Sequence, residues 1–107
     1  MTRAYIAGPM SGLPDHNYPA FAEAARQLRA HGIDAVNPAE NGLPAEAPWH
    51  MHMRADIAQL VTCEAIVLLP GWQASRGATL EHQIAKRLGF RIYQTIDALL
   101  AAERRAA

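Results

Sequence analysis

The stretch Ser75-Arg76-Gly77-Ala78-Thr79-Leu80-Glu81 decides the fold, because it joins a predicted buried strand to a predicted helix. The apolar run at 65–70 precedes it and is typical of a strand covered on both faces. A helix is predicted over 79–88, with an apolar stripe formed by Leu80, Ile84 and Leu88. A glycine-containing turn that leads into a helix N-terminus favours an anion, because its N–H groups lack intrahelical partners. The helical spacing also predicts that Glu81 lies in the first turn and points inward.

The rest of the chain repeats this alternation of strand and helix. Further short strands are predicted at 3–7, 33–37 and 90–93. One helix is predicted from an N-cap at Asn17 to a C-cap at Gly32, and another begins at Thr95 or Asp97. A helix is also predicted over about 50–62, and its apolar stripe consists of Met53, Ile57, Leu60 and Val61. The pattern predicts a small doubly wound α/β domain, Rossmann- or flavodoxin-like, with a parallel sheet of about four to five strands in the order 2-1-3-4.

In such a sheet, ligands bind beyond the carboxyl ends of the strands at the point where the strand order reverses. Here that point lies between the first and third strands. The loops at these two strand ends are 8–17 and 71–79, and both contain glycines. We therefore expect the two loops to converge on one ligand-binding crevice. The loop at 38–49 has no periodicity and is long for so small a domain, which is typical of functional or mobile loops.

Composition excludes several classes of protein. The 10 Lys and Arg residues balance the 10 Asp and Glu residues, which argues against non-specific binding to nucleic acid or to an anionic membrane. The single cysteine, Cys63, excludes an internal disulfide and fits a reducing compartment. No apolar stretch reaches the roughly 20 residues of a membrane span, and no signal peptide is evident. We expect one soluble, cytoplasmic domain over residues 1–107.

Two carboxylates are predicted to point inward. Asp56 falls between Met53 and Leu60 on the inward face of its helix, where burial raises the pKa of a carboxyl and suits a general acid. For Glu81, the helix N-terminus favours the ionised form, which suits a nucleophile. Two carboxyls whose pKa values are pushed apart are typical of enzymes that cleave glycosidic bonds. The structural alternative is that Glu81 caps its helix and that Asp56 pairs with Arg54 or another surface cation.

Three short motifs together resemble the nucleoside 2-deoxyribosyltransferase superfamily. These are the N-terminal strand with its Gly-Pro turn at 5–9, Asp56 ahead of the third strand, and the segment Gly77-Ala78-Thr79-Leu80-Glu81 after that strand. The nearest branch is the small uncharacterised group called domain of unknown function 4406, and the deoxynucleoside 5′-monophosphate N-hydrolases are further relatives. The resemblance covers most of the chain, from Tyr5 to about Tyr93.

The resemblance implies cleavage or exchange of an N-glycosidic bond through a covalent sugar–glutamate intermediate. Glu81 would be the nucleophile, Asp56 would protonate the leaving base, and Tyr5 would hold the nucleophile. The first loop would shape the sugar pocket through Gly8, Pro9, Met10, Ser11 and Gly12. No metal or organic cofactor is implied, and the partner is a small nucleoside or nucleotide. Relatives often complete each site from a neighbouring subunit, so a homo-oligomer, a dimer or larger, is expected.

The chain departs from the transferases just before Gly77, where they usually carry an acid that holds the sugar hydroxyls. Ser75 and Arg76 stand here instead, and their donors suit a phosphate, as in the nucleotide hydrolases. The alternative is that Arg76 is a solvated loop cation. Trp72 is placed to stack on a base, or else it only covers the end of the sheet.

The remaining candidates carry less chemistry. His50 and His52 do not share a helix face, and no third residue completes a metal-ligand pattern. Cys63 is predicted to be a small buried side chain. A second function from another class stays open, in which the same crevice binds a nucleotide as a signal without turnover.

Overall fold

The computed structural model describes residues 2–106, and within this range four strands form one parallel sheet in the order β2-β1-β3-β4. The strands are β1 (Arg3–Ala7), β2 (Asp34–Val36), β3 (Ala65–Leu68) and β4 (Arg91–Tyr93). Tyr5 of β1 pairs with Val36 on one side and with Ile66 on the other. The predicted α/β class and strand order are confirmed, with β1 and β3 as the two central strands.

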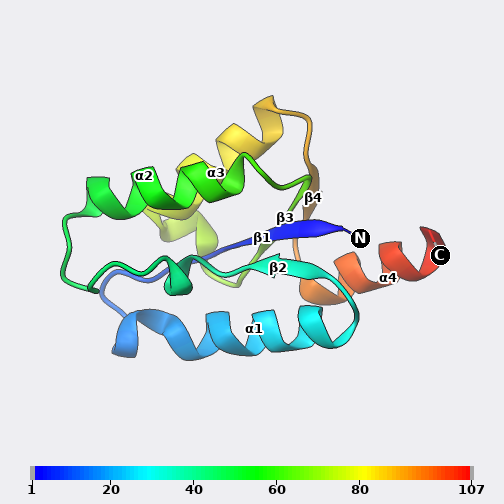
Figure 1. The fold of residues 1–107 in the computed structure, drawn as a ribbon, viewed down its shortest axis with the longest axis horizontal. Helices are drawn as coiled ribbons and strands as arrows, with labels where there is room; N and C mark the ends of the chain where they lie inside the picture. Colours follow the sequence, from blue (N-terminus) through cyan, green and yellow to red (C-terminus); the bar gives the residue numbers. More distant parts are fainter. Residues whose placement is uncertain (1, 107) are drawn as a thin grey trace.

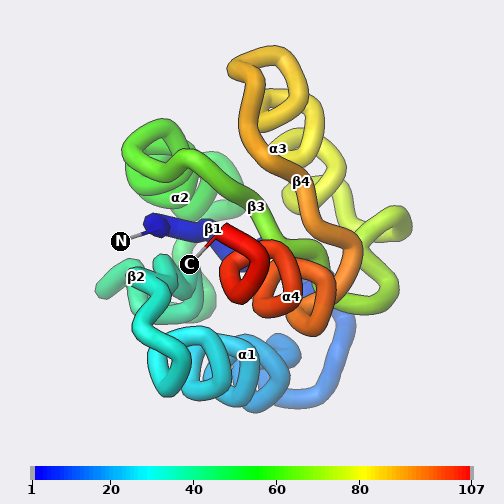
Figure 2. The backbone as a smooth tube through the Cα atoms, turned by 90° about the vertical axis from the view of Figure 1, so that its right-hand side faces the viewer, coloured from blue at the N-terminus to red at the C-terminus, as the bar shows by residue number. Residues whose placement is uncertain are grey.

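Helices cover both faces of the sheet, as Figures 1 and 2 show. One face carries α1 (Tyr18–Ala30) and α4 (Ile96–Ala106), and the other carries α2 (Trp49–Leu60) and α3 (Arg76–Arg87). Short 3₁₀ turns precede or follow them: η1 (Pro14–Asn17), η2 (Pro38–Glu40) and η3 (Trp72–Ala74). Among residues 2–106, none of the helices has the length and apolar composition that a membrane crossing needs.

The sheet separates two hydrophobic cores, and the alternation of side chains along β1 assigns each residue to one of them. Ala4 and Ile6 pack into the core beneath α1 and α4. Tyr5 and Ala7 pack into the core beneath α2 and α3. Tyr5 therefore points toward the two helices that carry Asp56 and Glu81.

Helix α3 begins at Arg76, three residues before the predicted start. The Ser75 side chain caps it by accepting a hydrogen bond from the backbone N–H of Ala78 at 3.1 Å. The predicted apolar stripe is wrong at two positions, because Leu80 and Leu88 are 39% and 56% exposed. The buried face instead consists of Ala78, Glu81 and Ala85. Small alanines let the helix lie close to the sheet, and the larger leucines next to them remain outside.

Other element ends differ in smaller ways. Helix α2 begins at Trp49 and ends at Leu60, so Val61 lies outside it and is exposed, against the prediction. Asn17 precedes α1 but does not cap it, because its Nδ2 donates to the carbonyl of Pro9 at 2.9 Å. Thr95 does cap α4, with its hydroxyl accepting from the N–H of Ala98 at 3.0 Å. Cys63 is buried as predicted.

Candidate active site

Tyr5 and Glu81 form a buried pair at the centre of the α2/α3 face. The Tyr5 hydroxyl donates to Oε2 of Glu81 at 2.6 Å, a short hydrogen bond. Tyr5 is fully buried, and Glu81 is 5% exposed. Among residues 2–106, every side-chain nitrogen or oxygen that is shielded from solvent has a hydrogen-bond partner. Oε1 of Glu81 has no such partner in that range. It is therefore not fully shielded from solvent, and a ligand can contact it.

Burial dominates the electrostatics of Glu81 and raises the pKa of its carboxyl to about 8. The hydrogen bond from Tyr5 acts in the opposite direction, and the nearby charge of Asp56 raises this pKa further. The predicted ionising effect of the helix N-terminus is wrong. Since α3 begins at Arg76, Glu81 lies in the second turn, beyond the turn in which the dipole acts. The alternative role as a helix cap is also wrong, because Ser75 is the cap.

Asp56 belongs to α2, which covers the same face of the sheet, and is 6% exposed. Burial raises the pKa of its carboxyl, as predicted. Its Oδ1 accepts a hydrogen bond from Nδ2 of Asn41 at 2.9 Å. Within the described part of the chain it forms no ion pair with Arg54 or with any other cation, so the predicted alternative for Asp56 is wrong.

Asn41 is a site residue that the sequence analysis missed. It lies in the irregular segment after β2, where no periodicity identifies a buried position. The signal that could have found it is the Asn41-Gly42 pair, which is typical of a turn in which the asparagine bonds its own backbone. Its Oδ1 does accept from the N–H of Leu43 at 2.9 Å. This contact leaves the amide nitrogen to face Asp56.

The two glycine-bearing loops meet, as predicted, at the carboxyl ends of β1 and β3. A Cβ on Gly8 would lie 2.8 Å from Cβ of Leu69, so only glycine permits this approach without a shift. Gly71 has a φ of +86°, and a Cβ there would lie 3.5 Å from Cγ of Pro9. Ser11 and Gly12 are exposed.

Met10 is partly buried and packs against the other core, beneath α1 and α4. That core lies across the sheet from Tyr5, and the predicted part of Met10 in the sugar pocket stays a prediction.

The residues at the start of α3 lie against the start of α2. The guanidinium carbon of Arg76 lies 3.7 Å from the centre of the Trp49 ring. A Cβ on Gly77 would lie 3.1 Å from the sulfur of Met53, so a larger residue there would require a small shift of the Met53 side chain. Trp72 contacts the ring of His82, with ring centres 4.5 Å apart. Arg76 is therefore an oriented cation that stacks on an aromatic ring.

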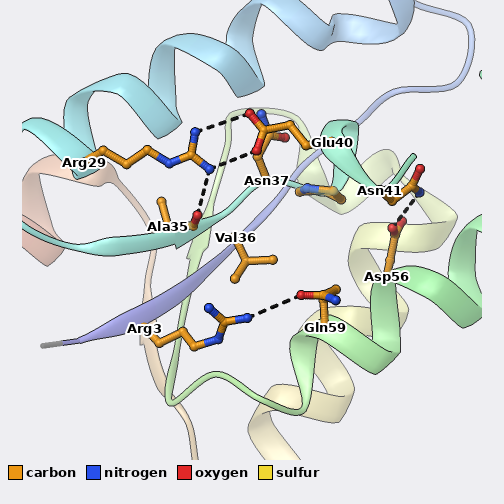
Figure 3. Close-up of a pocket in the computed structure, with 10 residues that line it drawn as sticks. Arg3, Arg29, Ala35, Val36, Asn37, Glu40, Asn41, Asp56 and Gln59 are labelled. Carbon is orange, nitrogen blue, oxygen red and sulfur yellow. Dashed lines mark hydrogen bonds and ion pairs between the residues drawn. The ribbon is translucent and has the colours of Figure 1, made fainter. Parts of the chain in front are cut away.

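A polar cavity of about 260 Å³ runs along the edge strand β2, and Asp56 is one of its lining residues. Figure 3 shows Asp56 and Asn41 at one end of it and the ion pair of Arg29 with Glu40 at the other. The sequence analysis did not predict this cavity. In the described residues, no group of three His, Cys, Asp or Glu side chains is placed to hold a metal ion.

Comparisons with known proteins agree with this architecture. The family described as "Domain of unknown function (DUF4406)" matches residues 2–94. A solved structure, the 2-desoxiribosyltransferase from Leishmania mexicana, superposes with a TM-score of 0.67 at 19% sequence identity. The match covers 86% of this chain and 62% of that one, so the chain spans less than two thirds of its relative's length. This likeness establishes a common fold. The chain matches none of the curated proteins.

Proposed function

Since the chain belongs to the family described as "Domain of unknown function (DUF4406)", we propose a function from the site itself. The protein cleaves or exchanges the N-glycosidic bond of a nucleoside or a nucleoside 5′-monophosphate. One observation carries this proposal: the buried Tyr5–Glu81 hydrogen bond, with the charge of Asp56 acting on the same carboxyl. The fold shared with a 2-desoxiribosyltransferase supports the class of reaction.

In the proposed reaction, Oε1 of Glu81 attacks the anomeric carbon of the sugar while the bond to the base breaks. The electrons of that bond go to the base nitrogen, and Asp56 supplies the base with a proton. Tyr5 holds Oε2, so that Oε1 is the attacking atom. Water or a second base then attacks the sugar ester and gives its proton to Asp56. The Glu81 carboxylate is released, and both carboxyls return to their starting states.

The protonation of the pair constrains this mechanism. Glu81 must be ionised to attack, yet its pKa of about 8 favours the protonated form at neutral pH. In the favoured form the single proton lies on Glu81 and Asp56 is ionised. In the productive form the proton lies on Asp56 and Glu81 is ionised, so the two forms have the same total charge. We expect a minor population of this form to react, with the developing positive charge of the sugar favouring an ionised Glu81 as the transition state forms.

A 5′-phosphate is the proposed reason for the cation at the start of α3. Arg76 stacks on Trp49 and forms no ion pair within residues 2–106. Next to it, the Ser75 oxygen already accepts from Ala78, which leaves its hydroxyl proton available to donate. These donors favour a nucleoside monophosphate over a free nucleoside.

A second candidate function is nucleotide binding without turnover. The raised pKa of Glu81 favours it, because a neutral carboxyl donates and accepts hydrogen bonds with ribose hydroxyls and does not attack carbon. In that case the same crevice serves as a sensor.

Release of free base separates the two functions. The protein is incubated with a panel of nucleosides and nucleoside 5′-monophosphates, with and without an acceptor base, and free base is measured by chromatography. We expect release from a monophosphate, abolished in Glu81→Ala and weakened mainly through KM in Arg76→Ala. If no member of the panel loses its base while calorimetry shows binding, the sensor function replaces the enzyme.

A further inference from the structure

The segment after β2 is tied to α2 by a chain of side-chain hydrogen bonds that begins at Asn41. Its amide orientation is set by the backbone, since Oδ1 accepts from the N–H of Leu43 at 2.9 Å. Nδ2 therefore carries the two protons of this side chain. One is donated to Oδ1 of Asp56 at 2.9 Å, and the other faces Nδ1 of His52 at 3.0 Å.

This orientation fixes the tautomer of His52. Because Nδ1 faces a donor, it must be the unprotonated, accepting nitrogen of the ring. The proton then lies on Nε2, which donates to the carbonyl of Pro44 at 3.0 Å. His52 precedes Asp56 by one helical turn, so both side chains lie on the same side of α2. The ring thus holds the segment at two points, Asn41 and Pro44, against the helix that carries the acid.

The consequence for Asp56 concerns which oxygen holds its proton. Oδ1 accepts from Asn41 and is oriented as an acceptor. Oδ2 has no hydrogen-bond partner among residues 2–106 and, by the same reasoning as for Glu81, is accessible. The favoured place for a proton on this carboxyl is therefore Oδ2.

We propose that Asn41 is the positioning residue of Asp56, and that His52, in its Nε2–H tautomer, holds Asn41 in place. Asn41 makes Oδ2 the oxygen that holds the proton and turns it toward a bound ligand. Its role in turnover rests on the proposed function, since only a reaction uses that proton. The positioning itself is a property of the folded chain, so it can be measured even without a substrate.

The first test is nuclear magnetic resonance of the full chain. We expect the nitrogen shifts of the neutral His52 ring to report the tautomer with the proton on Nε2. A proton on Nδ1, or equal averaging of the two tautomers, overturns the proposal, because the ring would then not accept from Asn41.

The second test follows the titration of Asp56 through its carboxyl carbon. Removal of a donor to the ionised form raises the pKa of a carboxyl. Asn41→Leu, of similar size, should therefore raise the pKa of Asp56. Thr95→Ala is the control: the Thr95 hydroxyl caps α4, on the opposite face of the sheet (Figure 1), by accepting from the N–H of Ala98. It should leave the titration unchanged.

If Asn41→Leu does not fold, Asn41→Ala serves as the second variant, because it removes the same Nδ2 donor to Asp56 without adding a larger apolar side chain. A rise in the pKa of Asp56 is again expected. An unchanged titration in the folded variants overturns the proposal.

Turnover gives a separate readout. For a substrate that loses its base, we expect Asn41→Leu to lower kcat by about 10- to 100-fold with KM changed less than about threefold, and Thr95→Ala to retain wild-type kcat. An equal loss in both variants would show a purely structural role and would overturn the proposal. If no substrate is found, the proposed function fails, but the resonance experiments still decide the role of Asn41.

Discussion

At the scale of single residues, the pKa of Glu81 shows that the effect of burial on a carboxyl is larger than the effect of a helix dipole. A helix dipole stabilises a nearby charge by about 0.3–1 kcal/mol, and only in the first turn. The change in the pKa of Glu81 from 4.5 to about 8 corresponds to on the order of 5 kcal/mol. Burial therefore outweighs both the dipole and the hydrogen bond from Tyr5. This carboxyl is costly to ionise, which is typical of catalytic groups but also consistent with a neutral hydrogen-bonding role.

The shared proton predicts a bell-shaped dependence of kcat/KM on pH. At low pH both carboxyls are protonated, so Glu81 cannot attack. Above about 8 both are ionised, and Asp56 cannot protonate the base. In Asp56→Asn we expect a rate about 10²–10⁴-fold lower that no longer falls at high pH. A basic limb that persists unchanged in Asp56→Asn would contradict the assigned role of Asp56.

Glu81 also makes the stability of the protein depend on pH. Its pKa is higher in the folded state than its ordinary value of 4.5, so its stabilising contribution is complete below about 4.5 and is lost as pH rises through 8. Glu81→Gln keeps an acceptor for Tyr5 but has no charge. We expect its free energy of unfolding, measured with urea at pH 5, 7 and 9, to exceed that of the wild type at pH 9 by a few kcal/mol. Parallel pH dependence of the two proteins would mean that Glu81 is not buried as described.

At the scale of elements, the sequence predicted the existence and type of each strand and long helix, but not all their ends. Gly77 was assigned to a turn, although it lies inside α3. Ser75 is a good N-cap, and the N–H that it holds belongs to Ala78, three residues later. That local signal competed with the helix-breaking tendency of glycine. The helix nevertheless includes Gly77, which lies close to the Met53 side chain of α2.

The same limits apply to the candidate site. Helical spacing correctly predicted that Asp56 and Glu81 are buried, because period is a local property of the sequence. Asn41 could not be found in this way, since its contact with Asp56 joins an irregular segment to a helix. The magnitude of the Glu81 pKa also depends on the full enclosure by β1, α2 and α3, which spacing alone does not describe.

Strain in the loop after β1 gives a prediction for this element. Asp15, His16 and Asn17 all have a positive φ, between 51° and 59°. This conformation costs an L-residue about 1–2 kcal/mol, which glycine avoids. Since glycine loses more entropy on folding, we expect Asp15→Gly to raise the free energy of unfolding by a net of about 0.5–1 kcal/mol.

The control for this prediction is Ala22→Gly, at an exposed position inside α1, which should destabilise the protein by about 1 kcal/mol. Thermal unfolding of the two variants measures the contrast. Equal destabilisation by both glycines would show that the loop is not left-handed at Asp15.

At the scale of the whole molecule, the sheet separates the site from half of the core. The topology followed from the alternation of elements, but the cavity along β2 did not, because its walls come from α1, β2 and α2 together. The α1/α4 core stabilises the fold from the opposite face. The α2/α3 core contains Tyr5, and the two helices that cover it carry the buried carboxyls of Asp56 and Glu81.

Two leucines test this separation, because both are fully buried but lie on opposite faces of the sheet. Leu99 belongs to α4, and Leu60 follows Asp56 by one turn of α2. Each change to alanine should destabilise the protein by about 2–5 kcal/mol. Under conditions where both variants are folded, we expect Leu99→Ala to keep the pKa of Asp56 and the wild-type kcat, and Leu60→Ala to change both. Equal effects on the site would contradict the division into two cores.

The covalent role of Glu81 is the central claim, and intact-mass spectrometry tests it most directly. The protein is mixed with each member of the nucleoside and monophosphate panel, quenched in acid during turnover, weighed and digested. We predict that the peptide containing Glu81 gains the mass of the substrate's sugar or sugar phosphate without its base. The Glu81→Gln variant should show no such added mass. Free base that accumulates without an adduct, an adduct on another peptide, or neither base nor adduct with any substrate would contradict the account.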